Sequence, residues 1–164
     1  MTNLSDAATA AERRATTLLV ERLRSVDRIT RADLNAAMVA GFGGTDADGL
    51  WTQRDSFEIL EHALAHHLQF GPYPLRSLAD VGAACDLLDR LPTQTVRSEE
   101  QIEWQQFSTP VDLAALAVVL AAIEPGDVIL EPSAGNGLLI AHCRDHAGLQ
   151  LNEYAAPRRA PASS

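Results

Sequence analysis

The feature that most constrains the fold is the order of predicted elements between residues 128 and 153. Residues 128–130 are a short apolar run with two β-branched side chains, and a turn-forming segment with two glycines follows them. Residues 138–144 then predict a helix, and residues 149–153 predict a second strand. A strand, a glycine-bearing loop, a helix and a strand follow one another in this way in doubly wound parallel sheets. This part of the chain is therefore expected to be α/β.

The loop at residues 131–137 has features of a ligand site. Gly135 and Gly137 let the backbone approach a ligand closely, and an acid at the end of the second strand can accept hydrogen bonds from ribose. That acid is Glu153, which follows Glu131 by 22 residues, a separation that fits one loop, one helix and one strand. Because the third glycine of the dinucleotide pattern is missing and Glu131 would repel a pyrophosphate, a cationic cofactor is favoured over the alternative of a nicotinamide.

The first ninety residues predict helices alone. Apolar residues recur at helical spacing in four segments, which are residues 5–28, 32–40, 51–70 and 78–91. A glycine loop follows the second segment, and glycine and proline residues follow the third. We therefore expect a helical region over residues 1–91.

The rest of the chain is expected to divide into an incomplete α/β domain over residues 92–154 and a disordered tail over residues 155–164. Residues 111–123 follow Pro110 and are nearly all Ala, Leu and Val, which predicts a helix that is buried on most sides. This apolar run contains Asp112 and is shorter than the roughly 20 residues that cross a bilayer, so no membrane crossing is expected.

Charge argues against a strongly basic nucleic-acid binder. The formal net charge is -9, and all 13 basic residues are arginines. Proteins that bind nucleic acid usually carry a basic surplus that neutralises phosphates. Six arginines do cluster near the N-terminus, at positions 13, 14, 22, 24, 28 and 31. They are interpreted either as a solvated helix face, which is favoured, or as a local basic stripe.

Several residues have both a functional and an ordinary structural interpretation. His62 and His66 lie four residues apart, a spacing that can bind zinc, but the catalytic His-Glu-x-x-His pattern is absent and a plain helix surface is favoured. Trp51 and Trp104 either stack on bases or belong to the core. The two cysteines, at positions 85 and 143, have no metal-ligand spacing, which favours a reducing, cytoplasmic setting.

Two short motifs together resemble a known family. Residues 106–110 read Gln-Phe-Ser-Thr-Pro, and residues 131–137 read Glu-Pro-Ser-Ala-Gly-Asn-Gly. This pair resembles the opening motifs of class I adenine-N6 methyltransferases, which use S-adenosyl-L-methionine. With the polar stretch at 93–105, the chain also resembles the strawberry notch group of phage and plasmid proteins, in which a methyltransferase domain precedes a helicase domain. The resemblance is good over residues 91–153 and loose over the helical region.

The resemblance implies the first βαβ unit of a Rossmann-like methyltransferase fold and a set of cofactor-binding residues. Phe107, Thr109 and Pro110 would wall the methionine end of the cofactor, and Glu153 would hold its ribose. The cofactor loop would consist of Glu131, Ser133, Ala134, Gly135 and Gly137.

The chain departs from the family because it has no Asn/Asp-Pro-Pro-aromatic motif, which orients the target amine in these enzymes. A truncated or split protein, or a degenerate remnant, is therefore expected, and no catalytic residue is assigned. Methylation of adenine in DNA or RNA would need a completing chain or domain, with a helicase-type protein as a possible partner. The alternative is a helical interaction module over residues 5–91 that carries a vestigial cofactor segment.

Overall fold

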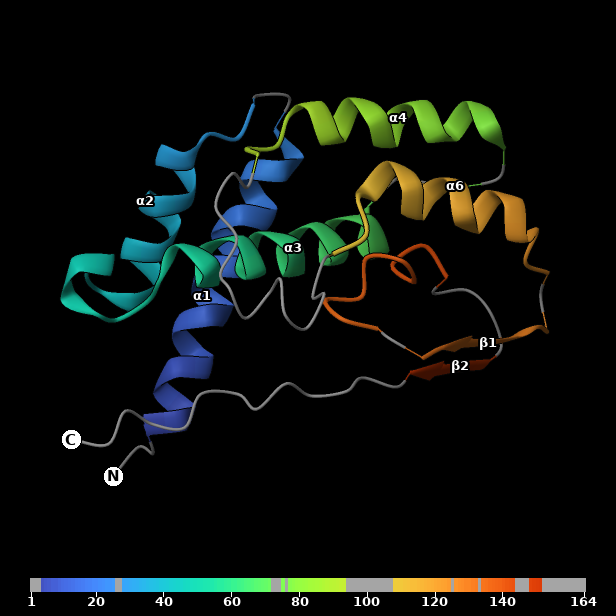
Figure 1. Cartoon of the computed structure of the whole chain (residues 1–164). Helices are drawn as coiled ribbons and strands as arrows, with labels where there is room; N and C mark the ends of the chain where they lie inside the picture. Colours follow the sequence, from blue (N-terminus) through green and yellow to red (C-terminus); the bar gives the residue numbers. More distant parts are fainter. Residues whose placement is uncertain are drawn as a thin grey trace, which may run out of the picture.

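The computed structural model is mainly helical, and Figure 1 shows its elements in chain order. The described residues are 4–25, 28–71, 75, 77–93, 108–124, 126–132, 134–143 and 148–151, with only the backbone described at 4–9 and 148–151. The helices are α1 (Leu4–Arg24), α2 (Arg31–Phe42), the short 3₁₀ helix η1 (Asp46–Asp48), α3 (Gln53–Phe70), α4 (Leu78–Asp89) and α6 (Val111–Ala121). The strands are β1 (Val128–Glu131) and β2 (Gly148–Leu151). The four helices expected before residue 91 are confirmed.

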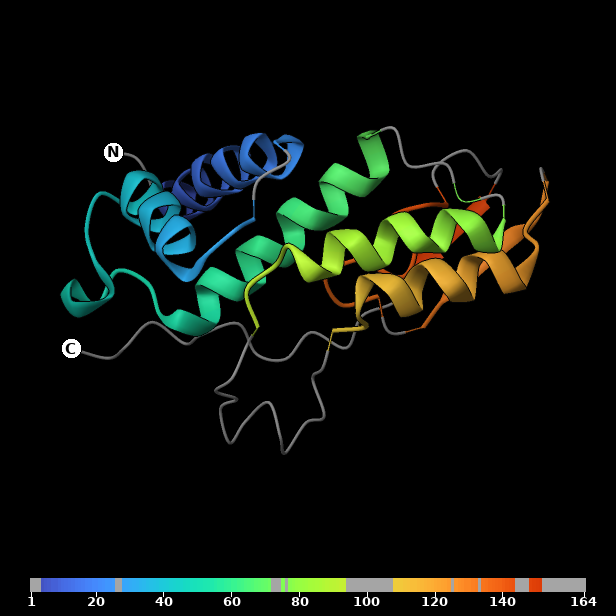
Figure 2. The same cartoon turned by 90° about the horizontal axis from the view of Figure 1, so that it is seen from above.

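The main core lies where α3 crosses α1 and α2 (Figures 1 and 2). Leu19 of α1, Met38 of α2 and Leu64 of α3 are buried together in one cluster. Trp51, just before α3, is 2 % exposed, and its indole Nε1 donates a hydrogen bond to the Gly44 carbonyl at 2.8 Å. Of the two interpretations of this tryptophan, the structure therefore supports the core residue.

Helices α1 and α2 approach each other closely at Gly41. A Cβ atom added to Gly41 would lie 2.8 Å from both the Ala11 carbonyl oxygen and the Ala15 Cβ atom. Arg14 reinforces the crossing, because its Nη2 and Nε atoms donate to the Gly41 carbonyl at 2.7 and 3.1 Å. The crossing thus requires small side chains on both helices.

Four helix starts share the same capping pair, a Ser or Thr followed three residues later by an Asp. In each pair the Asp carboxylate accepts the backbone N–H of the capping residue at 2.7 or 2.8 Å. The pairs are Thr30 with Asp33, Thr45 with Asp48, Thr52 with Asp55, and Ser77 with Asp80. Hydrogen bonds from Thr30 hold the pKa of Asp33 below its usual range. Part of the negative charge therefore lies where helix dipoles favour it.

Several arginines bind backbone carbonyls at helix ends. Besides Arg14, Arg90 donates to the Leu23 carbonyl at 3.1 Å and to the Ser25 carbonyl at the end of α1. Arg31 donates to the Thr93 carbonyl at 3.0 Å. The N-terminal arginine cluster thus includes residues with structural partners, in line with the ordinary interpretation.

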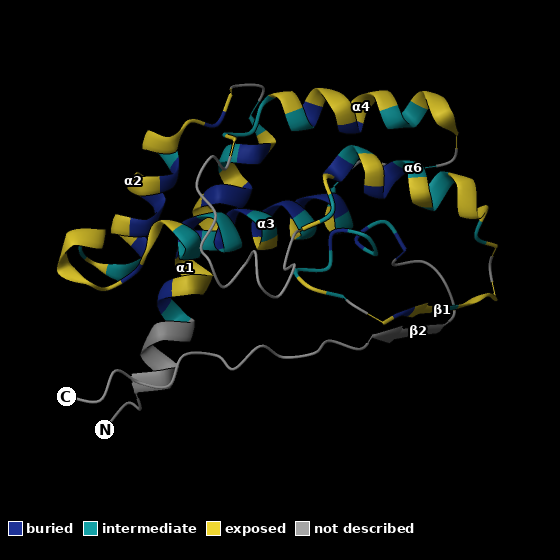
Figure 3. Cartoon of the chain, viewed as in Figure 1, coloured by how far each residue is buried: buried dark blue, intermediate teal, exposed yellow. Residues whose placement is uncertain are grey.

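Helices α4 and α6 lie side by side and run in opposite directions (Figures 1 and 2). Only Val111, Ala114 and Ala115 of α6 are buried, whereas Leu113 and Leu120 are 53 % and 68 % exposed (Figure 3). The expectation that this helix is buried on most sides is therefore wrong. The physical reason is that α4 covers one side of α6 and the two-stranded sheet is too small to cover the rest.

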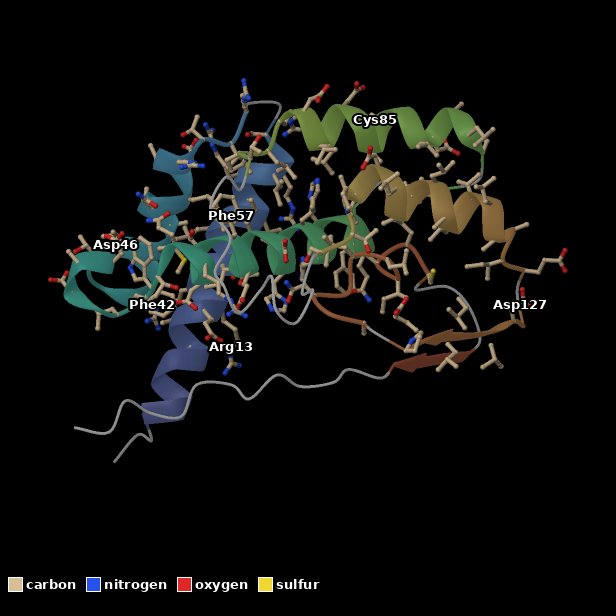
Figure 4. All side chains as sticks on the ribbon, in the orientation of Figure 1. Arg13, Phe42, Asp46, Phe57, Cys85 and Asp127 are labelled. Atoms are coloured by element: carbon tan, nitrogen blue, oxygen red, sulfur yellow. The ribbon has the colours of Figure 1, made fainter. Side chains whose placement is uncertain are left out.

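The two strands pair in parallel, with Val128 beside Gly148 and Glu131 beside Leu151. Asp127 precedes β1 in the turn after α6, where it accepts the Glu124 backbone N–H at 2.8 Å (Figure 4). Along β1, Val128 and Leu130 are exposed, whereas Ile129 is partly buried and Glu131 is buried. The expected strands are confirmed over residues 128–130 and 149–151.

The helix expected over residues 138–144 is wrong for its described part. Residues 138–142 form consecutive turns, in which the Cys143 N–H binds the Ile140 carbonyl at 2.9 Å and the Ala141 N–H binds the Leu138 carbonyl at 3.4 Å. Leu138, Ala141 and Cys143 are all buried, so packing fixes this segment without a regular helix.

The buried core continues past residue 91. Val111, Ala115, Leu138 and Ala141 belong to the same cluster as the buried residues of α1, α2 and α3. The division of the chain at residue 91 stays a prediction, and the expected tail at 155–164 lies outside the described residues.

Replacing Gly41 with Ala is expected to destabilise the protein by about 1–3 kcal/mol, because the new methyl group would push α1 away from α2. Urea unfolding followed by circular dichroism measures the change. The matched control is Gly82→Ala in α4, where no atom lies within 4 Å of an added Cβ atom. That control should gain about 0.5–1 kcal/mol from helix propensity. Equal stability of Gly41→Ala and the parent would contradict the close approach.

Replacing Asp33 with Ala is expected to lower stability at neutral pH. Because the pKa of Asp33 is lowered in the folded state, its stabilising contribution is present above its unfolded pKa and is lost as the pH falls through the folded pKa. The difference between parent and variant should therefore shrink in acid. Denaturant titrations at several pH values measure it, with Asp86→Ala on the exposed side of α4 as the control. A pH-independent difference for Asp33→Ala would rule out the charged cap.

Candidate functional site

The structure describes six of the nine residues predicted to bind the cofactor. Three of them, Phe107, Ser133 and Glu153, lie outside the described residues. The six described residues are Thr109, Pro110, Glu131, Ala134, Gly135 and Gly137. They belong to two segments, one before α6 and one that runs from the last residue of β1 into the loop after it.

The first segment, residues 108–110, leads directly into α6. Pro110 is the N-cap residue, and its carbonyl accepts the Ala114 N–H at 2.9 Å. Thr109 is partly buried, whereas Ser108 and Pro110 are exposed. The prediction that a helix begins after Pro110 is confirmed.

The second segment is the loop that follows β1. Glu131 ends the strand with its side chain buried at 7 % exposure. Gly135 and Gly137 have φ angles of 51° and 79°, which favour glycine, and the Gly137 N–H closes a turn onto the Ala134 carbonyl at 2.8 Å. Apart from the chain neighbours of each glycine, no atom of the described residues lies within 4 Å of a Cβ atom built on either glycine. The loop backbone is therefore open on the side where these side chains would stand.

A carboxylate from α3 connects the two segments. The Ser108 hydroxyl donates a hydrogen bond to Glu61 Oε2 at 2.5 Å. The Asn136 side-chain amide, which lies between the two loop glycines, donates to the same oxygen. Helix α3, the segment before α6 and the loop after β1 therefore meet at Glu61.

The surroundings of Glu61 favour its protonated form. Burial raises the pKa of Glu61 above its usual value, and this effect outweighs the hydrogen bonds from Ser108 and Asn136, which lower the pKa. The Glu58 carboxylate raises the pKa further, whereas His62 lowers it. The carboxylate is therefore held at this position at a cost in free energy when it is ionised.

Sequence reasoning did not identify Glu61 as a site residue. Glu61 lies in the apolar stripe of α3, because Phe57, Glu61, Leu64 and Leu68 are spaced four, three and four residues apart. A charged residue in such a stripe is a signal of a buried polar contact. The signal gives no information on the partners, which come from segments 47 and 75 residues away.

The histidines and cysteines considered as candidate functional residues lie in the following places. His62 and His66 are both exposed on α3, and the His66 ring packs against the Phe70 ring with centroids 4.7 Å apart. No group of three potential metal ligands occurs among the described side chains. Burial raises the pKa of the Cys143 thiol, whereas Cys85 lies exposed on α4 (Figure 4). Trp104 lies outside the described part of the chain.

No helix in the described ranges has the length and apolar character needed to span a membrane.

Comparison with known proteins adds no relative. The sequence matches no protein-family model, and no match was found among curated proteins or solved structures.

Replacing Glu61 with Gln is expected to make stability less sensitive to pH. Because the folded pKa of Glu61 is raised, its contribution is fully present below the unfolded pKa and is lost as the pH rises through the folded pKa. Gln keeps an acceptor for Ser108 and Asn136 but does not ionise. The stability of Glu61→Gln relative to the parent should therefore increase as the pH rises from acidic through neutral values.

Denaturant titrations across this range measure the relative stability. The control is Glu21→Gln on α1, where the replaced side chain is exposed. A relative stability of Glu61→Gln that stays constant with pH would show that the folded pKa of Glu61 is not raised.

Proposed function

We propose that this chain binds S-adenosyl-L-methionine as the cofactor-binding part of an adenine-N6 methyltransferase. The observation that carries the proposal is the contact of both motifs with Glu61. Ser108 belongs to the first motif and Asn136 to the second, and both donate hydrogen bonds to this carboxylate. Two segments that the resemblance assigns to one cofactor therefore lie next to each other.

The described residues fit the chemistry of this cofactor. Its sulfonium and amino groups are cationic, and Glu131 provides a buried acid at the start of the loop. The left-handed glycines at 135 and 137 leave space beside the loop backbone, because the described residues beyond their chain neighbours place no atom within 4 Å of an added Cβ atom. The buried acid supports a positively charged ligand better than a pyrophosphate.

In the proposed site, the bound cofactor supplies an activated methyl group. Glu131 would hold the cationic end of the cofactor, and Gly135 and Gly137 would let the loop backbone lie against it. Thr109 and Pro110 would wall its methionine end together with Phe107, and Glu153 would bind the ribose hydroxyls. These residues bind and orient, and no catalytic residue is proposed among them.

The proposal also covers the type of sheet and the partners of the chain. Strands β1 and β2 would be the first two strands of a Rossmann-like sheet, in keeping with their parallel pairing. Methyl transfer to DNA or RNA would use groups from a completing chain or domain, with a helicase-type protein as the proposed partner. A reducing, cytoplasmic setting belongs to the same proposal.

Calorimetric titration with S-adenosyl-L-methionine tests the proposal. The parent should show saturable binding, and Glu131→Ala and Glu153→Ala should lose most of it because each removes a proposed cofactor contact. Glu131→Gln keeps the size of the buried side chain and removes only its charge, so it separates loss of binding from misfolding.

The control for this titration is Glu124→Ala, which removes an exposed carboxylate in the turn before β1. It should bind as the parent does. Absence of binding by a folded parent, with native circular dichroism, would refute the proposed function.

A second candidate is a helical interaction module in which the cofactor segment is vestigial. It is favoured by large apolar side chains that stand exposed in the helical region, with Phe70 at 60 % and Leu78 at 64 % exposure. This candidate predicts no cofactor binding. It also predicts that a fragment ending at Leu91 stays folded, which circular dichroism and gel filtration would measure.

A further inference from the structure

We propose that Glu61 is a positioning residue of the cofactor site, whose carboxylate holds the Ser108 segment and the Asn136 loop together. This inference rests on the proposed function and extends the site to helix α3, which lies in the helical region. No motif of the resemblance includes Glu61. The role follows from the geometry around one oxygen atom.

Both hydrogen bonds end on the same oxygen, Glu61 Oε2. A shared acceptor keeps the Ser108 hydroxyl and the Asn136 amide within a few ångströms of each other. Glu61 therefore sets the distance between the start of α6 and the loop after β1.

The sequence of the loop makes it costly in conformational entropy to fix. Asn136 lies between two glycines in left-handed conformations, and the part of the chain that the structure describes places no atom beyond the chain neighbours within 4 Å of a Cβ atom at either glycine. Glycine loses more conformational freedom than any other residue when it is fixed. A contact through the Asn136 side chain orders the loop before a ligand arrives, which reduces the entropy cost of binding.

The polarity of the contact is defined. In the structure the Asn136 side-chain amide nitrogen donates to Glu61 Oε2. Asp at position 136 would place two carboxylates against each other, and Gln at position 61 would then restore an amide–carboxylate pair with donor and acceptor exchanged. Exchange of the two groups therefore distinguishes a direct contact from general damage to the fold.

Hydrogen–deuterium exchange of the full chain, read on peptides that cover residues 134–138, tests the role without cofactor. In Glu61→Ala and in Asn136→Asp the loop amides should exchange about tenfold faster than in the parent. The double variant Glu61→Gln with Asn136→Asp should return to within about threefold of the parent. Glu21→Ala, which removes an exposed carboxylate of α1, is the control and should exchange as the parent does.

Titration of the same variants with S-adenosyl-L-methionine links loop order to the cofactor. Affinity should fall about tenfold in Glu61→Ala and Asn136→Asp and recover in the double variant. Unchanged loop exchange in folded Asn136→Asp, or faster exchange with unchanged affinity, would overturn the positioning role. A parent that binds no cofactor would refute the proposed function, whereas the exchange data would still decide whether Glu61 orders the loop.

Discussion

The carboxylate of Glu61 joins three parts of the chain that lie far apart in the sequence. Helix α3 packs against α1 and α2, so its position is fixed by the main core. From this fixed helix, Glu61 accepts hydrogen bonds from the segment before α6 and from the loop after β1. The apolar cluster that includes Val111 and Leu138 covers the same junction. Two irregular segments thereby acquire defined positions without a large sheet to support them.

Several charged residues of this acidic chain lie at helix ends and bind backbone groups there. Aspartates stand at the third position of four helix starts, and Arg14 and Arg90 bind carbonyls where α2 and α1 end. Both placements complement the helix dipole and satisfy backbone groups that a helix leaves unpaired. The arginine cluster near the N-terminus is thus explained in part by backbone capping.

Local sequence signals predicted the elements well and their surroundings poorly. The periodicity of Leu60, Leu64 and Leu68 gave α3, and Pro110 marked the start of α6, because both signals depend on neighbouring residues. The exposure of Leu120 and the turns after Leu138 depend on what packs against them, which local pattern does not contain. For the same reason the role of Glu61 was not predicted, because its partners lie 47 and 75 residues further along the chain. Cofactor binding at Glu131 and Gly135 remains a prediction from the resemblance.

The length of chain between Glu61 and its partners has a consequence for the order of folding. The two hydrogen bonds close loops of 47 and 75 residues, so each carries a large loop-closure entropy. During synthesis Asn136 is also added to the chain after the whole of α1, α2 and α3. The helices can therefore pack first, with the Glu61 carboxylate still hydrated. The loop after β1 can then gain its contact with Glu61 on a surface that is already formed.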